Sequence, residues 1–451
     1  MNFSPDELAR GTGGTLMRAG ATGSVCTDTR KITAGDWFLA LRGERFDAHD
    51  FLEQAVDAGA SGVIAERVPE GWNHGHIAVD NGLTALQNLG RHVRSQFNGP
   101  VVGITGSAGK TTTRAMIGLA LEGLGSVHQT AGNFNNHIGL PLTLLDAPPN
   151  ADAWVLEMGM NHAGEIDLLQ NIGRPNVRVI TNVGIAHLEG LGSIEAIARA
   201  KAELFDGAQA GDILCVNDDD PFVRDMTIPD DCKVIRYGSS NECDIQLLSA
   251  SVDPDKLDTC FKFAVGDQIH EGRLPSPGIH MAHNAIAAIA VGHSLGLEPN
   301  AMAHRIAQYQ PVGMRLRIED GPLDTRVIND AYNANPMSVA ANLKTLASIP
   351  SAPNRRRVAL LGDMLELGPT EIQQHAETGA LALSLGLDIV GFAGPRFTEA
   401  MGPSALCAQN AEALADELRD RLHPGDILFI KGSRGMKMER VLQALDPKET
   451  S

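Results

Sequence analysis

The stretch 103–113 has the residue types and the spacing of a phosphate-binding loop. Residues 103–111 read Gly-Ile-Thr-Gly-Ser-Ala-Gly-Lys-Thr and are close to the pattern G-x-x-x-x-G-K-[ST], with five residues instead of four between Gly103 and Gly109. In such a loop the backbone N–H groups surround the phosphates, the lysine reaches the β- and γ-phosphates, and the hydroxyl can bind Mg2+. We therefore expect a nucleoside triphosphate to bind Gly106, Ser107, Ala108, Gly109, Lys110, Thr111 and Thr112.

The residues on both sides of this loop predict the strand and the helix that must hold it. Val101, Val102 and Ile104 are typical of a buried strand, and residues 113–122 have the composition of a helix. The alternative is a glycine-rich turn with a coincidental lysine, but such a turn would not need both flanks. The loop predicts nucleotide binding and leaves open what is done with the nucleotide.

Two more side chains, Glu157 and His187, could take part in the same chemistry. Glu157 and His187 each follow an apolar run that reads as a strand, so they can converge on the sheet edge where the loop lies. A carboxylate there can hold Mg2+, and we favour this role for Glu157 over capping of the next helix. A lone histidine is as readily a satisfied polar group as a metal ligand. Lys201, on a helix predicted at 193–205, reads by default as an exposed cation.

The composition limits the kind of protein. Its 451 residues predict roughly two to four domains, and the net charge of -18 argues against a sequence-independent surface for nucleic acid or anionic membranes. Six cysteines without a C-x-x-C pair indicate reduced thiols. The chain opens without a signal-peptide pattern and has no apolar span that suits a membrane helix. We expect a cytoplasmic protein with no membrane insertion.

The order of strand and helix signals predicts three α/β domains. Residues 1–98 form a small first domain that ends with a predicted helix at 85–94. Residues 99–311 alternate strands and helices, with a β-rich stretch near 232–275, and predict a parallel sheet like that of P-loop ATPases. Residues 312–451 contain four strand-loop-helix units and predict a doubly wound, Rossmann-like sheet without the G-x-G-x-x-G turn for a dinucleotide.

Other polar stretches are ambiguous on their own. Residues 27–30 and 47–51 flank a strand predicted within 35–43 and could grip a ligand, but solvated turns look the same. The first turn of an alanine-rich helix at 280–290 could meet a nucleotide base, although core packing explains the alanines equally well.

A set of motifs occurs in an order that resembles one known family. They are the loop at 103–113 and residues 133–141, 156–159, 181–189, 200–204 and 329–336. This order is similar to that of the Mur ligases, the ATP-dependent amide-forming enzymes of cytoplasmic peptidoglycan synthesis, and the resemblance covers nearly the whole chain. Within the family, residues 329–338 and 361–368 are similar to those of members that add D-alanyl-D-alanine to UDP-N-acetylmuramoyl-tripeptide. The Asp-Asn-Pro-Arg sequence of the members that add meso-diaminopimelate is absent.

The resemblance implies roles for the ambiguous residues. Lys110, Glu157, His187 and Lys201 would be catalytic. Glu157 would complete a first Mg2+ site with Thr111, while His187 and Lys201 would serve a second Mg2+. Lys201 would be carbamoylated for this, since an ammonium cannot coordinate a cation. Asn284 would contact adenine, Asp330 the ribose and Arg315 the γ-phosphate. Residues 1–98 would bind the UDP moiety of the substrate, with contacts from Thr27, Asp28, Thr29, Arg30 and His49. The other substrate-binding residues would be Asn136, Tyr332, Asn333, Asn335 and Lys431.

The implied reaction proceeds in two steps. The terminal carboxylate of UDP-N-acetylmuramoyl-tripeptide attacks the γ-phosphate of ATP, giving an acyl phosphate and ADP, and the amine of D-alanyl-D-alanine then displaces phosphate. Mg2+ and Lys110 would stabilise the negative charge that develops, and domain closure would gate the reaction. The alternatives are another Mur-type or folylpolyglutamate-type ligase, or a nucleotide-regulated binding module with slow hydrolysis. We expect a monomer that binds small molecules and no nucleic acid.

Overall fold

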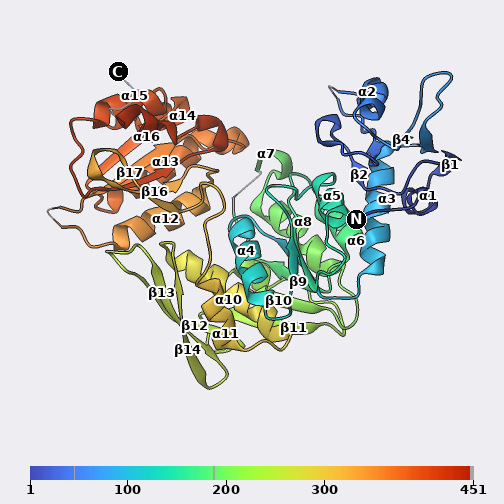
Figure 1. The fold of residues 1–451 in the computed structure, drawn as a ribbon. Coiled ribbons are helices and arrows are strands. Elements are labelled where there is room, and N and C mark those ends of the chain that lie inside the picture. The colour runs from blue at the N-terminus through green and yellow to red at the C-terminus, as the bar shows by residue number, and fades with distance from the viewer. Residues whose placement is uncertain (45, 186–187, 353, 447–451) are drawn as a thin grey trace.

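The computed structural model describes residues 1–44, 46–185, 188–352 and 354–446, without the side chains of residues 188 and 189. Within these residues the strands form three sheets, of five, nine and six strands, which follow one another along the chain. Figure 1 shows the N-terminal sheet at the right, the largest sheet in the centre and the C-terminal sheet at the left. This arrangement confirms the predicted α/β class.

The N-terminal sheet has the strand order β1-β5-β4-β3-β2 and is parallel except at β1. The elements of this part are α1 (Pro5–Thr12), β1 (Thr15–Arg18), β2 (Val25–Cys26), β3 (Trp37–Leu39), α2 (Leu52–Asp57), β4 (Gly62–Ala65), β5 (Gly75–Ala78) and α3 (Gly82–Gln96). The predicted strand at 35–43 is thus only three residues long. Helix α3 packs on the central part, where a side chain added at Gly90 would touch Pro141.

The central sheet has the order β14-β13-β12-β11-β10-β9-β6-β8-β7. Strands β6 to β12 are parallel, and β12, β13 and β14 form an antiparallel extension at the bottom of Figure 1. This extension lies within the β-rich stretch predicted near 232–275. The elements are β6 (Val101–Thr105), α4 (Lys110–Leu121), β7 (Val127–Gln129), α5 (Gly139–Leu145), β8 (Ala153–Glu157), α6 (Glu165–Gly173), β9 (Val177–Ile180), α7 (Leu188–Leu191), α8 (Ile194–Asp206), β10 (Ile213–Asn217), α9 (Pro221–Arg224), β11 (Lys233–Gly238), β12 (Ile245–Val252), β13 (Thr259–Val265), β14 (Gln268–Leu274), α10 (Ile279–Ser294) and α11 (Pro299–Ile306).

The C-terminal sheet has the order β15-β16-β20-β17-β18-β19 and is parallel except at β15. Its elements are β15 (Arg317–Asp320), β16 (Arg326–Asp330), α12 (Pro336–Ser348), β17 (Arg357–Gly362), α13 (Glu371–Ser384), β18 (Ile389–Ala393), α14 (Pro395–Met401), β19 (Leu406–Ala408), α15 (Ala411–Leu418), β20 (Ile427–Lys431) and α16 (Arg440–Leu445). The predicted doubly wound pattern is present, with an antiparallel edge strand that the sequence did not indicate.

Helix α8 illustrates how local sequence sets an element that matters for the site. The Ser193 side chain accepts a hydrogen bond from the backbone N–H of Ala196 and so caps the first turn. Ile197 and Leu204 lie on the buried face at helical spacing, and the helix ends before Gly207. The helix predicted at 193–205 is confirmed, and it carries Lys201 toward the interior.

Polar contacts join the central and the C-terminal parts. The Ser276 hydroxyl donates to the carbonyl of Leu316 at 3.1 Å. Asp255, between β12 and β13, forms an ion pair with Arg355 of the C-terminal part. The two parts therefore lie in contact, and the loops at the carboxyl ends of their parallel strands can line one cavity.

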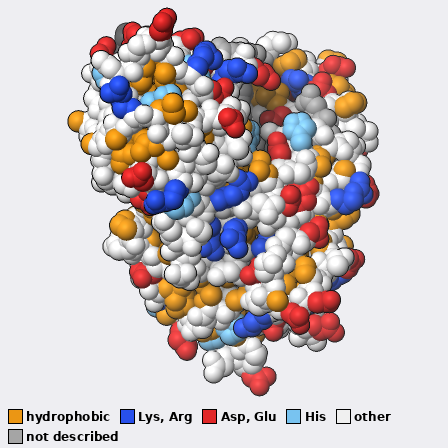
Figure 2. All heavy atoms as spheres, turned by 90° about the vertical axis from the view of Figure 1, so that its right-hand side faces the viewer, with side chains coloured by type: hydrophobic (Ala, Val, Ile, Leu, Met, Phe, Trp, Pro, Cys, Tyr) orange, Lys and Arg blue, Asp and Glu red, His pale blue; other side chains and the backbone are white. Residues whose placement is uncertain are grey.

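The surface agrees with the acidic composition. On the face shown in Figure 2, acidic and basic side chains are interspersed, and Lys and Arg form small groups rather than one continuous basic surface. Within the described residues, every helix is too short or too polar to span a lipid bilayer.

Candidate functional site

The phosphate-binding loop lies between β6 and α4, as its flanks predict. Gly106 has φ +152° and Gly109 has φ +79°, values that side chains other than glycine rarely allow. A Cβ atom at position 106 would lie 1.9 Å from the Thr181 hydroxyl oxygen, and one at position 109 would lie 2.8 Å from Asn284 Oδ1. Both glycines are therefore required by the turn and by close neighbours.

The loop is held from the side by the end of β9. The backbone N–H of Ser107 donates to the carbonyl of Asn182 at 3.0 Å, and the N–H of Ala108 donates to Asn182 Oδ1 at 2.8 Å. No side chain caps the first turn of α4. The N–H groups of that turn and the helix dipole are thus oriented to bind an anion such as a phosphate.

Lys110 lies at the start of α4 and folds back over the loop. Its Nζ donates to the carbonyl of Gly106 at 2.7 Å. Burial lowers the pKa of Lys110, Glu157 raises it, and the charge of Arg315 lowers it. The Glu157 carboxylate and the Arg315 guanidinium are therefore close enough to Lys110 to change its pKa. Two cations near one another suit a multiply charged anion such as a triphosphate.

Glu157 ends β8 and is 2% exposed. Its Oε1 accepts hydrogen bonds from Thr111 Oγ1 at 3.3 Å and from Asn135 Nδ2 at 2.9 Å, while Oε2 lies 3.7 Å from Arg114 Nη1. In the described part of the chain no three His, Cys, Asp or Glu side chains cluster as a metal site. The oxygen donors of Thr111 and Glu157 nevertheless fit Mg2+, which is commonly held by one or two carboxylates together with substrate phosphates.

A cavity of about 600 Å³ opens in front of these residues and is lined from the central and C-terminal parts. It brings together most of the predicted site residues. Those lining it are Ser107, Ala108, Gly109, Lys110, Thr111, Thr112, Asn136, Glu157, Asn284, Arg315, Asp330, Tyr332, Asn333, Asn335 and Lys431. Gly106 and Lys201 do not line it, and His187 lies outside the described residues.

The C-terminal wall of the cavity is built around Asp330, at the end of β16. Lys431, at the end of the neighbouring strand β20, forms a buried ion pair with this carboxylate and donates to the carbonyl of Asn333 at 2.9 Å. The guanidinium of Arg315 lies over the Tyr332 ring, 4.1 Å from its centroid. Lys431 therefore fixes Asp330 and the next loop, while Arg315 is held above an aromatic ring near the phosphate loop.

Lys201 is the predicted site residue with the most unusual surroundings. It is 1% exposed, and no carboxylate of the side chains that the structure describes lies within ion-pair distance of it. Burial holds its pKa well below the usual range, and the charge of Lys110 adds to this effect. The predicted role as an exposed cation therefore does not hold, and because a buried ammonium is costly, a neutral or modified amine fits the described surroundings better.

The residues predicted to bind the UDP end of the substrate, at 27–30 and at His49, lie in loops and 3-10 turns of the N-terminal part, and none of them lines this cavity. Asp28 caps a 3-10 turn, Thr29–Lys31, and pairs with Arg30 at 2.9 Å, which lowers the pKa of Asp28 to about 2. His49 is buried, and both of its ring nitrogens are used. Nδ1 lies 2.6 Å from Asp47 Oδ1, and Nε2 accepts from the N–H of Glu66 at 3.0 Å. His49 therefore stabilises the conformation of the 47–51 segment through hydrogen bonds of its buried ring.

Two side chains next to Glu157 are missing from the sequence predictions. Asn136, the predicted substrate-binding residue of the loop before α5, lines the cavity, and its Oδ1 accepts from the N–H groups of Ile138 and Gly139. Its neighbour Asn135, the first of the two, contacts Glu157. The second is Arg114, which is 5% exposed. Its position one helical turn after Lys110 places both cations on the same face of α4, which the sequence alone could have indicated.

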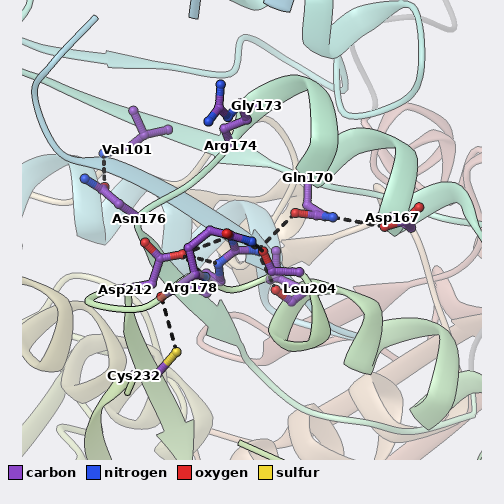
Figure 3. Close-up of polar contacts among 12 residues, drawn as sticks. Val101, Asp167, Gln170, Gly173, Arg174, Asn176, Arg178, Leu204, Asp212 and Cys232 are labelled. Atoms are coloured by element: carbon purple, nitrogen blue, oxygen red, sulfur yellow. Dashed lines mark hydrogen bonds and ion pairs between the residues drawn. The ribbon is translucent and has the colours of Figure 1, made fainter. Parts of the chain in front are cut away.

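Arg178 of β9 fixes the end of the helix that carries Lys201. Figure 3 shows its guanidinium among Gln170, Leu204 and Asp212. It donates to the carbonyls of Leu204 at 2.7 Å and Gly207 at 2.9 Å, and pairs with Asp212 at 3.1 Å. The arginine thus satisfies carbonyls at the C-terminal end of α8, where a cation also suits the helix dipole.

We expect Arg178→Met to lower the free energy of unfolding by about 3 to 5 kcal/mol, because it leaves Asp212 and the helix carbonyls without their buried partner. Urea denaturation followed by circular dichroism measures this. Arg236→Met is the control, since Arg236 forms a pair of similar length with Asp218 but its side chain is 36% exposed, against 2% for Arg178. Its loss is expected to cost at most about 1 kcal/mol. Equal losses for both variants would contradict the assigned role.

His280, at the start of α10, lines the same cavity and gives the fold a pH dependence. Burial lowers its pKa to about 4, and the charges of Lys431 and His283 add to this effect. In the unfolded chain the same histidine titrates near pH 6.5. The unfolded state therefore binds a proton between about pH 6.5 and pH 4 that the folded state does not, so stability falls as the pH is lowered through this window.

Replacement of His280 by glutamine is expected to remove this part of the pH dependence. Between pH 7 and pH 5 the difference in unfolding free energy between wild type and His280→Gln should shift by about 1 to 2 kcal/mol in favour of the variant. Urea titrations of both proteins at three pH values measure it. A constant difference across that range would show that His280 does not titrate as described.

The chain is similar to known proteins in both sequence and fold. The sequence matches models described as Mur ligase family, catalytic domain at residues 23–94, Mur ligase middle domain at 104–292, and Mur ligase, glutamate ligase domain at 314–434. A UDP-N-acetylmuramoyl-tripeptide--D-alanyl-D-alanine ligase of Bacillus subtilis is 38% identical over 93% of this chain and 92% of its own. A crystal structure of MurF from Acinetobacter baumannii has a TM-score of 0.91 at 30% identity and 99% coverage of both chains. That of MurF ligase from Thermotoga maritima in complex with ADP has a TM-score of 0.84 at 29% identity, covering 94% of this chain and 96% of that one.

Proposed function

This chain belongs to the Mur ligase family, and we propose that it is the ATP-dependent, ADP-forming ligase that joins D-alanyl-D-alanine to UDP-N-acetylmuramoyl-tripeptide. The observation that carries this function is the match, over nearly the full length of both chains, to relatives of that name. The product would be the UDP-N-acetylmuramoyl-pentapeptide precursor of peptidoglycan. We infer that the enzyme works in the cytoplasm as a monomer on small-molecule substrates.

The proposed division of labour follows the three sheets. Residues 1–98 would bind the uridine diphosphate end of the substrate, residues 99–311 would bind ATP, and residues 312–451 would complete the site and bind the dipeptide. The contacts between the central and C-terminal parts, and the cavity that both line, support a site shared by two domains. Asn284 would then meet adenine from α10, and Asp330 would meet the ribose from β16.

The chain's own groups account for the electrostatics of the proposed reaction. Lys110 and the N–H groups of the first turn of α4 would hold the β- and γ-phosphates, with Arg315 supplying a further positive charge. Mg2+ held by Thr111 and Glu157 would supply additional neutralisation of phosphate charge. The cavity walls would align the substrate carboxylate with the γ-phosphate and keep water away from it, which favours acyl phosphate formation over hydrolysis.

Two other functions are less well supported. A folylpolyglutamate-type ligase does not account for the family match at residues 23–94 or for the names of the relatives. A nucleotide-regulated binding module would need no cavity that is shared with a second sheet.

The decisive experiment is a panel of amino acids and dipeptides tested for ATP-dependent phosphate release with UDP-N-acetylmuramoyl-tripeptides that carry either lysine or diaminopimelate. We expect release to depend strictly on D-alanyl-D-alanine together with one of the two tripeptides. Release that needs a single amino acid would indicate another amide ligase. Slow release that needs no acceptor would support the binding module.

A further inference from the structure

The Asn135 side chain lies between two residues at the end of β8. Its Nδ2 donates to Glu157 Oε1 at 2.9 Å. Its backbone carbonyl accepts from the N–H of Gly159 at 2.8 Å. A Cβ atom added at Gly159 would lie 2.9 Å from Asn135 Oδ1, so the amide occupies space that only a glycine at 159 leaves free. The local structure is therefore built around this amide.

The orientation of the amide follows from chemistry. An ionised carboxylate can only accept hydrogen bonds, so the NH2 group of Asn135 must face Glu157 and the carbonyl oxygen must face away. Hydrogen bonds between an amide and a carboxylate are stronger than those between neutral groups. Of the two hydrogen bonds that Oε1 accepts, the one from Asn135 is 2.9 Å long and the one from Thr111 is 3.3 Å long.

The opposite side of the carboxylate has a competing partner. Arg114 Nη1 lies 3.7 Å from Glu157 Oε2, which accepts no hydrogen bond from the residues that the structure describes, and Arg114 itself donates to the carbonyl of Thr130. The guanidinium is buried, so it attracts the carboxylate more strongly than a surface arginine would. The hydrogen bond from Asn135 and the attraction of Arg114 therefore act on different oxygens of the same carboxylate.

We propose that Asn135 is a positioning residue that keeps the Glu157 carboxylate directed at Thr111, so that these two oxygens can share one divalent cation with the bound nucleotide. The inference rests on the proposed function, which supplies the nucleotide and the cation. Because Asn135 belongs to the loop between β7 and α5, it also makes cation binding depend on the placement of that loop.

The test is calorimetric titration of ADP, with and without Mg2+, into the full-length protein. For Asn135→Ala we expect ADP affinity without Mg2+ to change less than about 2-fold, while the Mg2+-dependent gain in affinity falls by about 10-fold, which is the scale of one hydrogen bond to a charged group. The isosteric Asn135→Asp should lose more of the gain, because a second carboxylate would repel Glu157. Thermal melts confirm folding of each variant, and Asn135→Asp keeps the shape of the site if the alanine variant does not fold.

Asn171 provides a control. Its Nδ2 donates to the carboxylate of Asp167 at 3.0 Å on the exposed face of α6, and Asn171 does not line the cavity. Asn171→Ala should therefore keep the full Mg2+-dependent gain. An unchanged gain in both Asn135 variants would overturn the positioning role and leave the proposed function intact. Absence of Mg2+-dependent ADP binding in the wild type would overturn both.

Discussion

Replacing Lys110 by alanine is expected to abolish ligation, with a loss of at least about 1,000-fold in kcat/KM, or roughly 4 kcal/mol of transition-state stabilisation. Lys110 is the first residue of α4, directly after the phosphate loop, and its Nζ lies over the loop, 2.7 Å from Gly106 O. Its charge is most needed as the γ-phosphate is transferred, so the loss should appear mainly in kcat.

The measurement is phosphate release and pentapeptide formation at saturating ATP, with ADP affinity determined separately. Lys344→Ala is a suitable control, because Lys344 is an exposed lysine on α12 and does not line the cavity. A variant that lacks Lys110 and still ligates at a tenth of the wild-type rate or better would overturn the assignment of the whole site.

Replacing Lys201 by alanine should give the second largest loss, about 100-fold or more, and added short carboxylates such as formate or acetate should restore part of the activity. The buried amine has a pKa well below the usual range, which favours the neutral form that reacts with carbon dioxide. Carbamoylation would convert a cation without a described carboxylate partner into an anion that could ligate Mg2+. A small carboxylate diffusing into the space left by alanine would replace that anion.

Rescue is measured as activity against carboxylate concentration, and 13C-labelled carbon dioxide provides an independent readout, since a carbamate signal should appear in the wild type and not in Lys201→Ala. Lys262→Ala, which removes an exposed lysine paired with Glu271, should show neither loss nor rescue. Inactivity of Lys201→Ala at every carboxylate concentration, together with no carbamate signal in the wild type, would argue against the modification.

The sequence predicted those parts of the site that depend on short-range spacing. The phosphate loop needs a strand, two glycines, a lysine and a hydroxyl within 11 residues, all visible in the stretch 103–113. The sheet classes also followed from the alternation of strands and helices. Residues that act at the ends of parallel strands, such as Glu157, were located because strand ends mark the ligand edge of a sheet.

Contacts between distant parts of the chain could not be predicted in the same way. Asp330 and Lys431 are 101 residues apart, and their ion pair exists because β16 and β20 are neighbours, an order that no local pattern specifies. The choice between Asn135 and Asn136 depends on a backbone turn that directs one amide to Glu157 and the other to α5. The burial of Lys201 depends on how α8 packs against the central sheet, and the polarity of its sequence neighbours does not reveal it.

The hydrogen bonds between the phosphate loop and Asn182 have a consequence for the entropy of nucleotide binding. Ser107 and Ala108 are fixed by Asn182, and the Ser107 hydroxyl also donates to the carbonyl of Gly184 at 2.9 Å, so groups of the protein itself hold this part of the loop. Ordering a flexible backbone costs about 1 to 2 kcal/mol per residue, a cost that a preorganised loop has met during folding. Nucleotide binding should therefore cost little conformational entropy in this loop. The measured entropy of nucleotide binding should instead reflect the release of water and the ordering of the surrounding segments.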